Sequence, residues 1–94
     1  MASFTTRIEL DDVKLGDYYT LDDEMHRRGF TRTIKGSDAV YKMPEATYNF
    51  VGDIEAQAVY DKAVEAVAAL GRTGGIVVTQ SAGRVIGGLR KVAA

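Results

Sequence analysis

Residues 53–71 read DIEAQAVYDKAVEAVAALG, and this stretch decides the fold. Its apolar residues recur at steps of three and four, so at 3.6 residues per turn they form one stripe along a helix. Asp53 can accept hydrogen bonds from the first free N–H groups, and Gly71 can take the left-handed conformation that ends a helix. A helix with one apolar face needs a sheet or a second helix to cover it. The stripe comprises Ala56, Val59, Tyr60, Ala63, Val64, Val67 and Leu70.

Four segments outside this helix are typical of β-strands. The first alternates between apolar and polar residues from Phe4 to Leu10, which gives the strand one apolar face. The second, from Phe30 to Lys35, is rich in β-branched residues, which favour strands. The predicted strands are residues 4–10, 30–35, 46–51 and 76–79, with a short extended piece at residues 39–43 that Pro44 stops.

A second helix is predicted between the first two strands. It begins near Lys14 or Asp17 and continues to Arg28, and Gly29 is a typical helix-ending residue. Acidic residues come early in this segment and basic residues come late, which matches the helix dipole. Its predicted apolar stripe is Leu15, Tyr18, Leu21 and Met25.

The order of these elements is β-α-β-β-α-β. Right-handed crossovers place both helices on one face of an antiparallel sheet. The sequence therefore predicts an α+β, ferredoxin-like sandwich with four antiparallel strands, in a single domain of residues 1–94. Residues 85–89 could add a short C-terminal strand that pairs with a neighbouring protomer or folds back.

The other face of this sheet stays open, and a second copy of the chain is its simplest partner, so we expect a homodimer. The open face is predicted to carry Thr5, Arg7, Glu9, Thr47, Asn49, Val51, Val77 and Thr79.

Composition excludes several classes of function. The 94 residues contain no cysteine, which excludes disulfides, thiolate metal sites and cysteine nucleophiles. The net charge of −1 gives no overall field that attracts nucleic acid. No signal peptide or membrane-spanning run is present, so a cytoplasmic location without membrane contact is expected. No glycine-rich nucleotide motif occurs, and no cofactor is expected.

Asp11 and Asp12 follow the first strand. Paired carboxylates at such a position could bind Mg²⁺, which prefers oxygen ligands. The alternative is a polar turn that leads into the first helix.

His26 is the only histidine, and Asp22 lies four residues before it on the same helix flank. Asp22 could orient His26 for general acid–base chemistry. The alternative is an ordinary surface pair of the i,i+4 type, worth about 0.2–0.5 kcal/mol.

Basic residues gather in two parts of the sequence. They could line a groove for phosphate, and Tyr41, Tyr48 or Phe50 could stack on bases, although Tyr48 and Phe50 could equally belong to the core or to a dimer contact. Arg27 and Arg28 could instead complete the helix dipole. The first group is Arg27, Arg28, Arg32 and Lys35, and the second is Arg84, Arg90 and Lys91.

Two segments resemble a known family. MHRRGFTRTIKGSD (Met25–Asp38) and MPEATY (Met43–Tyr48), followed by the helix of residues 53–71, are similar to the GhoS family of small bacterial endoribonuclease antitoxins. The resemblance covers residues 4–80 in layout and implies a ferredoxin-like fold, a dimer, and binding or cleavage of single-stranded RNA. It assigns no catalytic residue. It is sharpest at Gly29, Phe30, Ile34 and Pro44–Tyr48.

These observations leave three hypotheses for function. The first is a small regulator of the toxin–antitoxin kind that binds or cleaves single-stranded RNA, with the first basic group holding phosphate. The second is a non-catalytic protein-binding module, an antitoxin or an inhibitor of a defence complex, which acts through a dimer surface or an acidic flank that imitates phosphate. The third is a dimer that encloses a small molecule. The acidic flank is Asp11, Asp12, Asp17, Asp22, Asp23 and Glu24.

Overall fold

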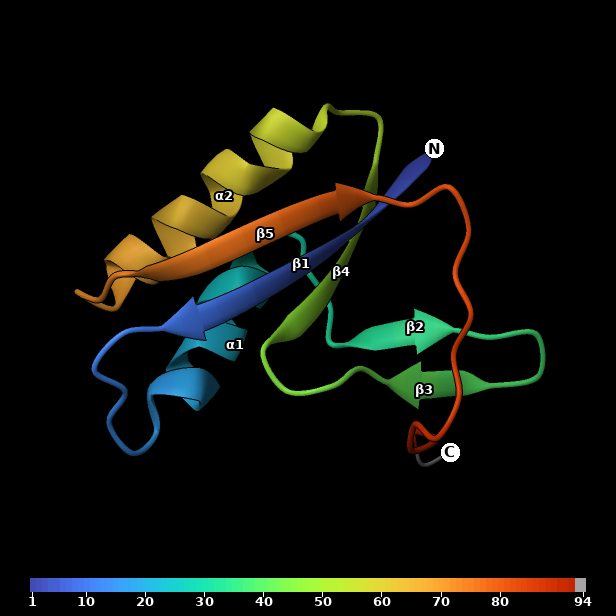
Figure 1. The fold of residues 1–94 in the computed structure, drawn as a ribbon, viewed down its shortest axis with the longest axis horizontal. Helices are drawn as coiled ribbons and strands as arrows, with labels where there is room; N and C mark the ends of the chain where they lie inside the picture. The colour runs from blue at the N-terminus through green and yellow to red at the C-terminus, as the bar shows by residue number, and fades with distance from the viewer. Residues whose placement is uncertain (93–94) are drawn as a thin grey trace.

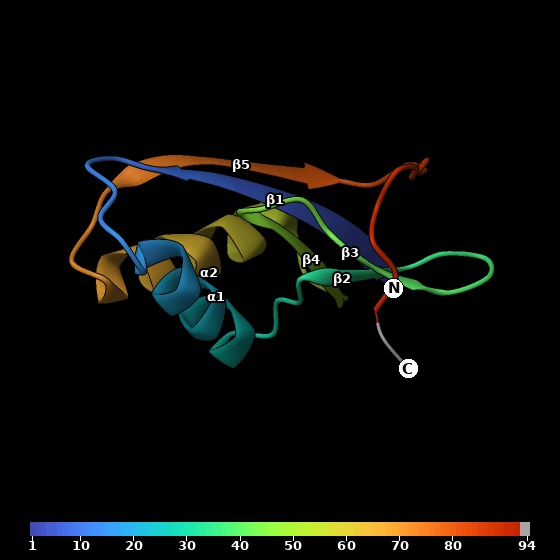
Figure 2. The ribbon, with the colours of Figure 1, turned by 90° about the horizontal axis from the view of Figure 1, so that it is seen from below.

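The computed structural model describes residues 1–92, so the last two residues of the expected domain lie outside it. The chain forms an α+β fold in which both helices lie on the same face of a sheet (Figure 1, Figure 2). Its elements are β1 (Ala2–Leu10), α1 (Asp17–Arg27), β2 (Thr33–Lys35), β3 (Val40–Lys42), β4 (Thr47–Gly52), α2 (Ala56–Ala69) and β5 (Gly74–Gln80).

The main sheet has three strands in the order β4-β1-β5, and both pairings are antiparallel. β1 is the central strand, and its Thr5 lies opposite Asn49 on one side and Thr79 on the other. The sheet therefore agrees with the predicted antiparallel arrangement but holds one strand fewer than expected.

The predicted strand at residues 30–35 does not continue along β4. Only Thr31 pairs with Asn49 there, through two backbone hydrogen bonds of 2.8 Å. At the next residue the carbonyl of Arg32 accepts the N–H of Met43, so the chain turns away from β4. Residues 33–35 then pair with β3 in a separate two-stranded hairpin.

The core lies between the sheet and the helices. Phe4, Thr6, Ile8 and Leu10 are buried, as the alternation in β1 predicts. The helix stripe is narrower than expected on α2, because Tyr60 and Val64 remain 39% and 40% exposed. The residues of α2 that are buried are Val59, Ala63, Ala66 and Val67.

Glycines end both helices as predicted. Gly29 follows α1 with φ 93°, and Gly71 follows α2 with φ 69°. Helix α1 begins at Asp17, one of its two predicted starts, whereas α2 begins later than predicted. Gly16 adopts φ 87° before α1, which leaves Leu15 outside the helix and fully exposed. Asp53 also does not cap α2, because the helix begins at Ala56 and the residue before it makes no side-chain cap.

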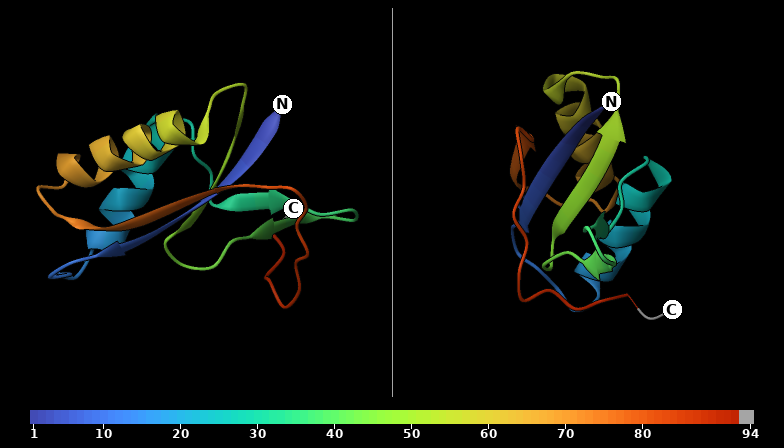
Figure 3. Two further views of the ribbon diagram at one scale, coloured as in Figure 1. Left: turned by 45° about the horizontal axis from the view of Figure 1, so that its top comes forward. Right: turned by 90° about the vertical axis from the view of Figure 1, so that its right-hand side faces the viewer.

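The chain after β5 folds back, which was one of the two predicted alternatives for it, but the predicted strand at residues 85–89 is absent, and within residues 81–92 only Lys91 makes an isolated bridge, to Tyr41. This segment returns along the β2–β3 hairpin (Figure 1, Figure 3). The N–H of Lys42 donates to the carbonyl of Arg90 at 2.8 Å, and the N–H of Val92 donates to the carbonyl of Val40 at 2.9 Å. We call residues 33–42 and 81–92 together the hairpin–tail unit.

The face of the main sheet opposite the helices carries small and polar side chains. Arg7, Glu9 and Thr79 are exposed there, and Val77 is 63% exposed. The assignment of side chains to the two faces of the sheet is therefore confirmed at these positions.

Candidate nucleic-acid interface

Arg28 of the first basic group lies in a pair of ionic contacts. Its guanidinium is 2.9 Å from the Glu24 carboxylate and 3.7 Å from that of Glu65 on α2. It also donates to the backbone carbonyl of Glu24. The charge of Arg28 is therefore largely used to hold α1 against α2, whereas the neighbouring Arg27 is exposed.

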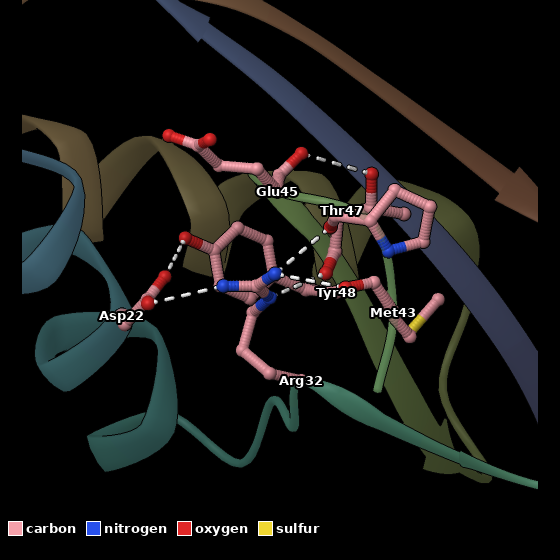
Figure 4. A network of polar contacts seen from close by, with 7 residues as sticks. Asp22, Arg32, Met43, Glu45, Thr47 and Tyr48 are labelled. Atoms are coloured by element: carbon pink, nitrogen blue, oxygen red, sulfur yellow. Dashed lines mark hydrogen bonds and ion pairs between the residues drawn. The ribbon is translucent and has the colours of Figure 1, made fainter. Parts of the chain in front are cut away.

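Arg32 is the centre of a polar network that Figure 4 shows from close by. Its guanidinium donates to Asp22 at 3.1 Å and to the carbonyls of Met43, Pro44 and Thr47 at 2.9, 3.0 and 3.1 Å. It also lies 5.6 Å from the ring centroid of Tyr48. Because these contacts use the guanidinium donors, Arg32 ties α1 to the segment before β4, and its capacity to hold a phosphate is small.

Asp22 accepts two hydrogen bonds from residues outside its helix. The phenol of Tyr48 donates to it at 2.5 Å, and Arg32 donates to its other oxygen. Burial raises the pKa of Tyr48, and the Asp22 carboxylate raises it further. The structure thus directs Asp22 towards Tyr48 and Arg32, whereas His26 lies exposed near the end of α1.

The carboxylates proposed as magnesium ligands lie in a turn. Asp11 accepts a hydrogen bond from the Thr73 hydroxyl at 3.0 Å, and Asp12 has a left-handed backbone with φ 50°. Within residues 1–92, no three histidine, cysteine, aspartate or glutamate side chains are grouped as metal ligands would be.

The acidic flank is also partly engaged within the chain. Asp17 lies 3.2 Å from the guanidinium of Arg72, which follows α2, and accepts the N–H of Lys14 at 2.8 Å. Together with the contacts of Asp22 and Glu24, this leaves Asp11, Asp12 and Asp23 as exposed members of the flank, of which Asp11 accepts the Thr73 hydroxyl.

The tail brings the second basic group to Lys35, the last member of the first group. Lys35 and Lys42 belong to the hairpin, whereas Arg84, Arg90 and Lys91 belong to the tail. The hydrogen bond between Lys42 and Arg90 joins the two segments directly. With five cations and Asp38 as its single carboxylate, the hairpin–tail unit has a formal charge of +4 in a chain of net charge −1.

The three aromatic residues considered for base stacking have different surroundings. Tyr48 is 1% exposed and belongs to the core, and the Phe50 ring packs 5.1 Å from that of Phe30. Tyr41 lies in the hairpin–tail unit, where its hydroxyl donates to Asp38 at 2.9 Å. Tyr41 is half-buried and is the one of the three that belongs to the segment carrying the grouped cations.

Sequence reasoning found both basic groups but not their meeting point. Lys42 and Arg90 are 48 positions apart and meet only because the tail pairs with β3. No residue of the tail specifies the strand with which it pairs.

Comparison of the chain with protein-family models, with curated proteins and with solved structures gave no match. The resemblance to GhoS antitoxins therefore rests on the residues quoted for it. Neither α1 nor α2 has the length and apolar composition that crossing a membrane requires, and the search covered residues 1–92.

Proposed function

We propose that this protein is a small regulator of the toxin–antitoxin kind that binds single-stranded RNA through the hairpin–tail unit. The observation that carries the proposal is the meeting of two distant basic groups through the backbone pairing of β3 with the tail. Cations that neutralise phosphates release condensed counterions, and this release supplies most of the affinity for a nucleic-acid backbone. The resemblance to RNA-directed antitoxins points in the same direction.

The unit also suits a single strand. Unpaired bases can stack on an aromatic ring, and Tyr41 lies one position before Lys42 in the hairpin. Four of the five cations are exposed: Lys35, Lys42, Arg90 and Lys91. The proposed surface does not depend on Arg27, Arg28 and Arg32, two of which are engaged in ion pairs, although Arg32 and Arg90 line a common pocket.

We place binding ahead of cleavage. The carboxylate that could have oriented His26 is instead hydrogen-bonded to Tyr48 and Arg32. A general base must be held in position by a partner to work efficiently, and Asp22 is not directed to that task. Labelled RNA should therefore be recovered intact after incubation with the purified protein, and site-dependent cutting would reverse this order.

The test is an equilibrium titration of a labelled single-stranded RNA, followed by fluorescence polarisation at several salt concentrations. The double variant Arg90→Ala/Lys91→Ala should bind more weakly. A plot of the logarithm of the binding constant against the logarithm of the salt concentration should be shallower for this variant, with a slope smaller by about 1.4. Each phosphate contact to a single strand contributes roughly 0.7 to that slope.

The matched control is Lys14→Ala/Arg27→Ala, which also removes two exposed cations but lies outside the hairpin–tail unit. It should lose much less affinity. Equal losses in the two double variants would mean that net charge alone determines binding, and the proposal would be wrong.

The proposal includes a fold relationship. A ferredoxin-like sandwich needs a strand beside β4, and the pairing of Thr31 with Asn49 occupies that position for a single residue. We interpret the chain as a ferredoxin-like variant in which the rest of this strand forms the hairpin. A solved structure in which residues 31–35 pair along β4, or pair elsewhere altogether, would distinguish the alternatives.

A homodimer is the second part of the proposal, and the edge of β5 favours it. β5 pairs with β1 on one side and, within residues 1–92, has no strand on the other. Its sequence GGIVVTQ has no charge and no proline, the devices that usually protect an edge strand. A second copy fits well, because antiparallel pairing centred on Val77 would place no like charges opposite each other within β5. The same edge would serve the alternative function of a non-catalytic protein-binding module.

A further inference from the structure

An open hollow of about 490 Å³ lies where the start of β1, the hairpin and the tail meet. Its lining contains two cations and several hydroxyl groups but no carboxylate. The polar side chains that line it are Ser3, Lys35, Ser37, Ser81 and Arg84.

Arg84 is the unusual member of this lining. Its Nε and Nη2 atoms are buried and have no hydrogen-bond partner among the described residues. Burial also lowers the pKa of its guanidinium. Removing a charged group from water without pairing it is unfavourable, and an arginine stays protonated rather than releasing that charge. Two nitrogens of this half-buried side chain therefore lack a partner, and an anion in the hollow would supply one once the guanidinium turns towards it.

Ser81 is held in a position to assist. Its N–H donates to the carbonyl of Ser3 at 2.8 Å, which ties the beginning of the tail to β1. Its hydroxyl oxygen accepts the N–H of Gly83 at 3.2 Å, so its own proton is left to donate to a ligand.

We propose that this hollow binds a terminal phosphate group, carried by the end of an RNA strand or by a free nucleotide. A terminal phosphate has a charge close to −2 at pH 7, which matches the two cations Lys35 and Arg84 better than the single charge of an internal phosphodiester. The guanidinium presents paired N–H donors that suit phosphate oxygens, and Lys35 adds a point charge. The inference rests on the proposed RNA binding for the source of the phosphate, but not for the site itself.

The experiment compares one short RNA sequence in two forms, with a 5′-phosphate and with a 5′-hydroxyl, by equilibrium titration. The phosphorylated form should bind roughly tenfold more tightly, as a charge-assisted contact would give. Arg84→Gln should reduce this ratio to about one, whereas the hydroxyl form should lose only the small share of affinity that one cation of the hairpin–tail unit contributes. Arg90→Gln, which lies outside the hollow, should weaken both forms equally.

A second measurement separates the site from RNA binding. Adenosine monophosphate is titrated into isotope-labelled protein, and the amide resonances of Ser81, Gly83 and Arg84 are followed by NMR. On adding the nucleotide, these resonances should shift in the wild type and in Arg84→Lys, and should shift less in Arg84→Gln. Thermal unfolding of each variant confirms that it is folded.

The outcomes are distinct. Equal affinity for the two RNAs, with no shift on adding the nucleotide, overturns the phosphate site but leaves RNA binding in place. A shift that is lost in Arg84→Gln, without binding of either RNA, supports the site with a free nucleotide as its ligand and overturns the proposed RNA function. Discrimination that survives Arg84→Gln overturns the assignment to this hollow.

Discussion

The phenol of Tyr48 on β4 donates a 2.5 Å hydrogen bond to the carboxylate of Asp22 on α1. The same carboxylate accepts a hydrogen bond from Arg32, which in turn binds three backbone carbonyls before and within β4. One side chain of α1 is thus joined both to the sheet and to the segment that leads into the hairpin. The network is mainly structural, and its stability effects can be measured without any ligand.

We expect Asp22→Ala to lower the free energy of unfolding by about 2–3 kcal/mol, because it leaves Arg32 and the buried Tyr48 hydroxyl without their partner. The matched control is Asp23→Ala, which removes an exposed carboxylate from the adjacent position and should change stability by less than about 0.5 kcal/mol. Urea unfolding followed by circular dichroism measures both. Equal effects of the two substitutions would show that the network contributes little.

Alkaline pH should destabilise the fold through Tyr48. Its pKa is raised above the ordinary value of about 10, so the folded state holds the phenol proton more tightly than the unfolded chain does. The stabilisation from this group is complete below about pH 10 and is lost as the pH rises further.

The measurement is the free energy of unfolding between pH 8 and 11, compared for the wild type and Tyr48→Phe. Above about pH 10 the free energy of unfolding should fall more steeply for the wild type than for Tyr48→Phe. The difference in slope should reach up to about 1.4 kcal/mol per pH unit, the value for one proton. Parallel pH profiles would mean that Tyr48 has no part in the alkaline loss of stability.

Self-association through β5 should be sensitive to a charge placed on its exposed side. Val77 is 63% exposed at the middle of β5 and lies opposite Arg7 of β1, so Val77→Glu should leave the monomer folded while setting two like charges together in the proposed dimer. Light scattering during gel filtration should then report a dimer for the wild type and a monomer for the variant. Val85→Glu, at a fully exposed position of the tail, is the control and should remain dimeric. A monomeric wild type would rule out this interface.

Alanine substitutions at two glycines with similar backbone angles can separate the cost of backbone strain from the cost of side-chain crowding. Gly16 and Gly29 have φ of 87° and 93°, so alanine is strained at both. A Cβ at Gly29 would lie 3.1 Å from the Phe50 ring, whereas at Gly16 it would meet nothing within 4 Å. We expect Gly29→Ala to cost about 1–2 kcal/mol more than Gly16→Ala, the excess being the cost of overpacking. Equal unfolding midpoints in urea would indicate that the Phe50 ring moves aside freely.

Local patterns predicted the parts of the fold that depend on neighbours in the sequence. The alternation in β1 identified its buried face, and the spacing of Val59, Ala63 and Val67 identified the face of α2 that packs on the sheet. Leu15 was wrongly included in the stripe of α1, because its spacing fits a helix and only the left-handed backbone of Gly16 excludes it. The prediction that residues 30–35 form a strand of the main sheet was wrong in its pairing, because β-propensity does not specify a partner strand.

The roles of charged residues were harder to predict. Arg28 and Arg32 lie close together in the sequence and read as a phosphate site, but their partners Glu65 and Asp22 are brought to them by the packing of α1. Arg84 attracted attention only as a member of a basic group. Its buried and unpartnered nitrogens are visible only when the tail is seen folded against the hairpin.

The placing of β1 at the centre of the sheet has a consequence for biosynthesis. Thr6 pairs with Val78, 72 positions later, so β1 leaves the ribosome well before the strand that completes its pairing. Contacts between such distant segments slow folding, because a long loop must close before they form. Until β5 has been made, one edge of β1 has no partner strand, and β1 also carries an apolar face. The nascent chain therefore needs protection from aggregation most during this interval.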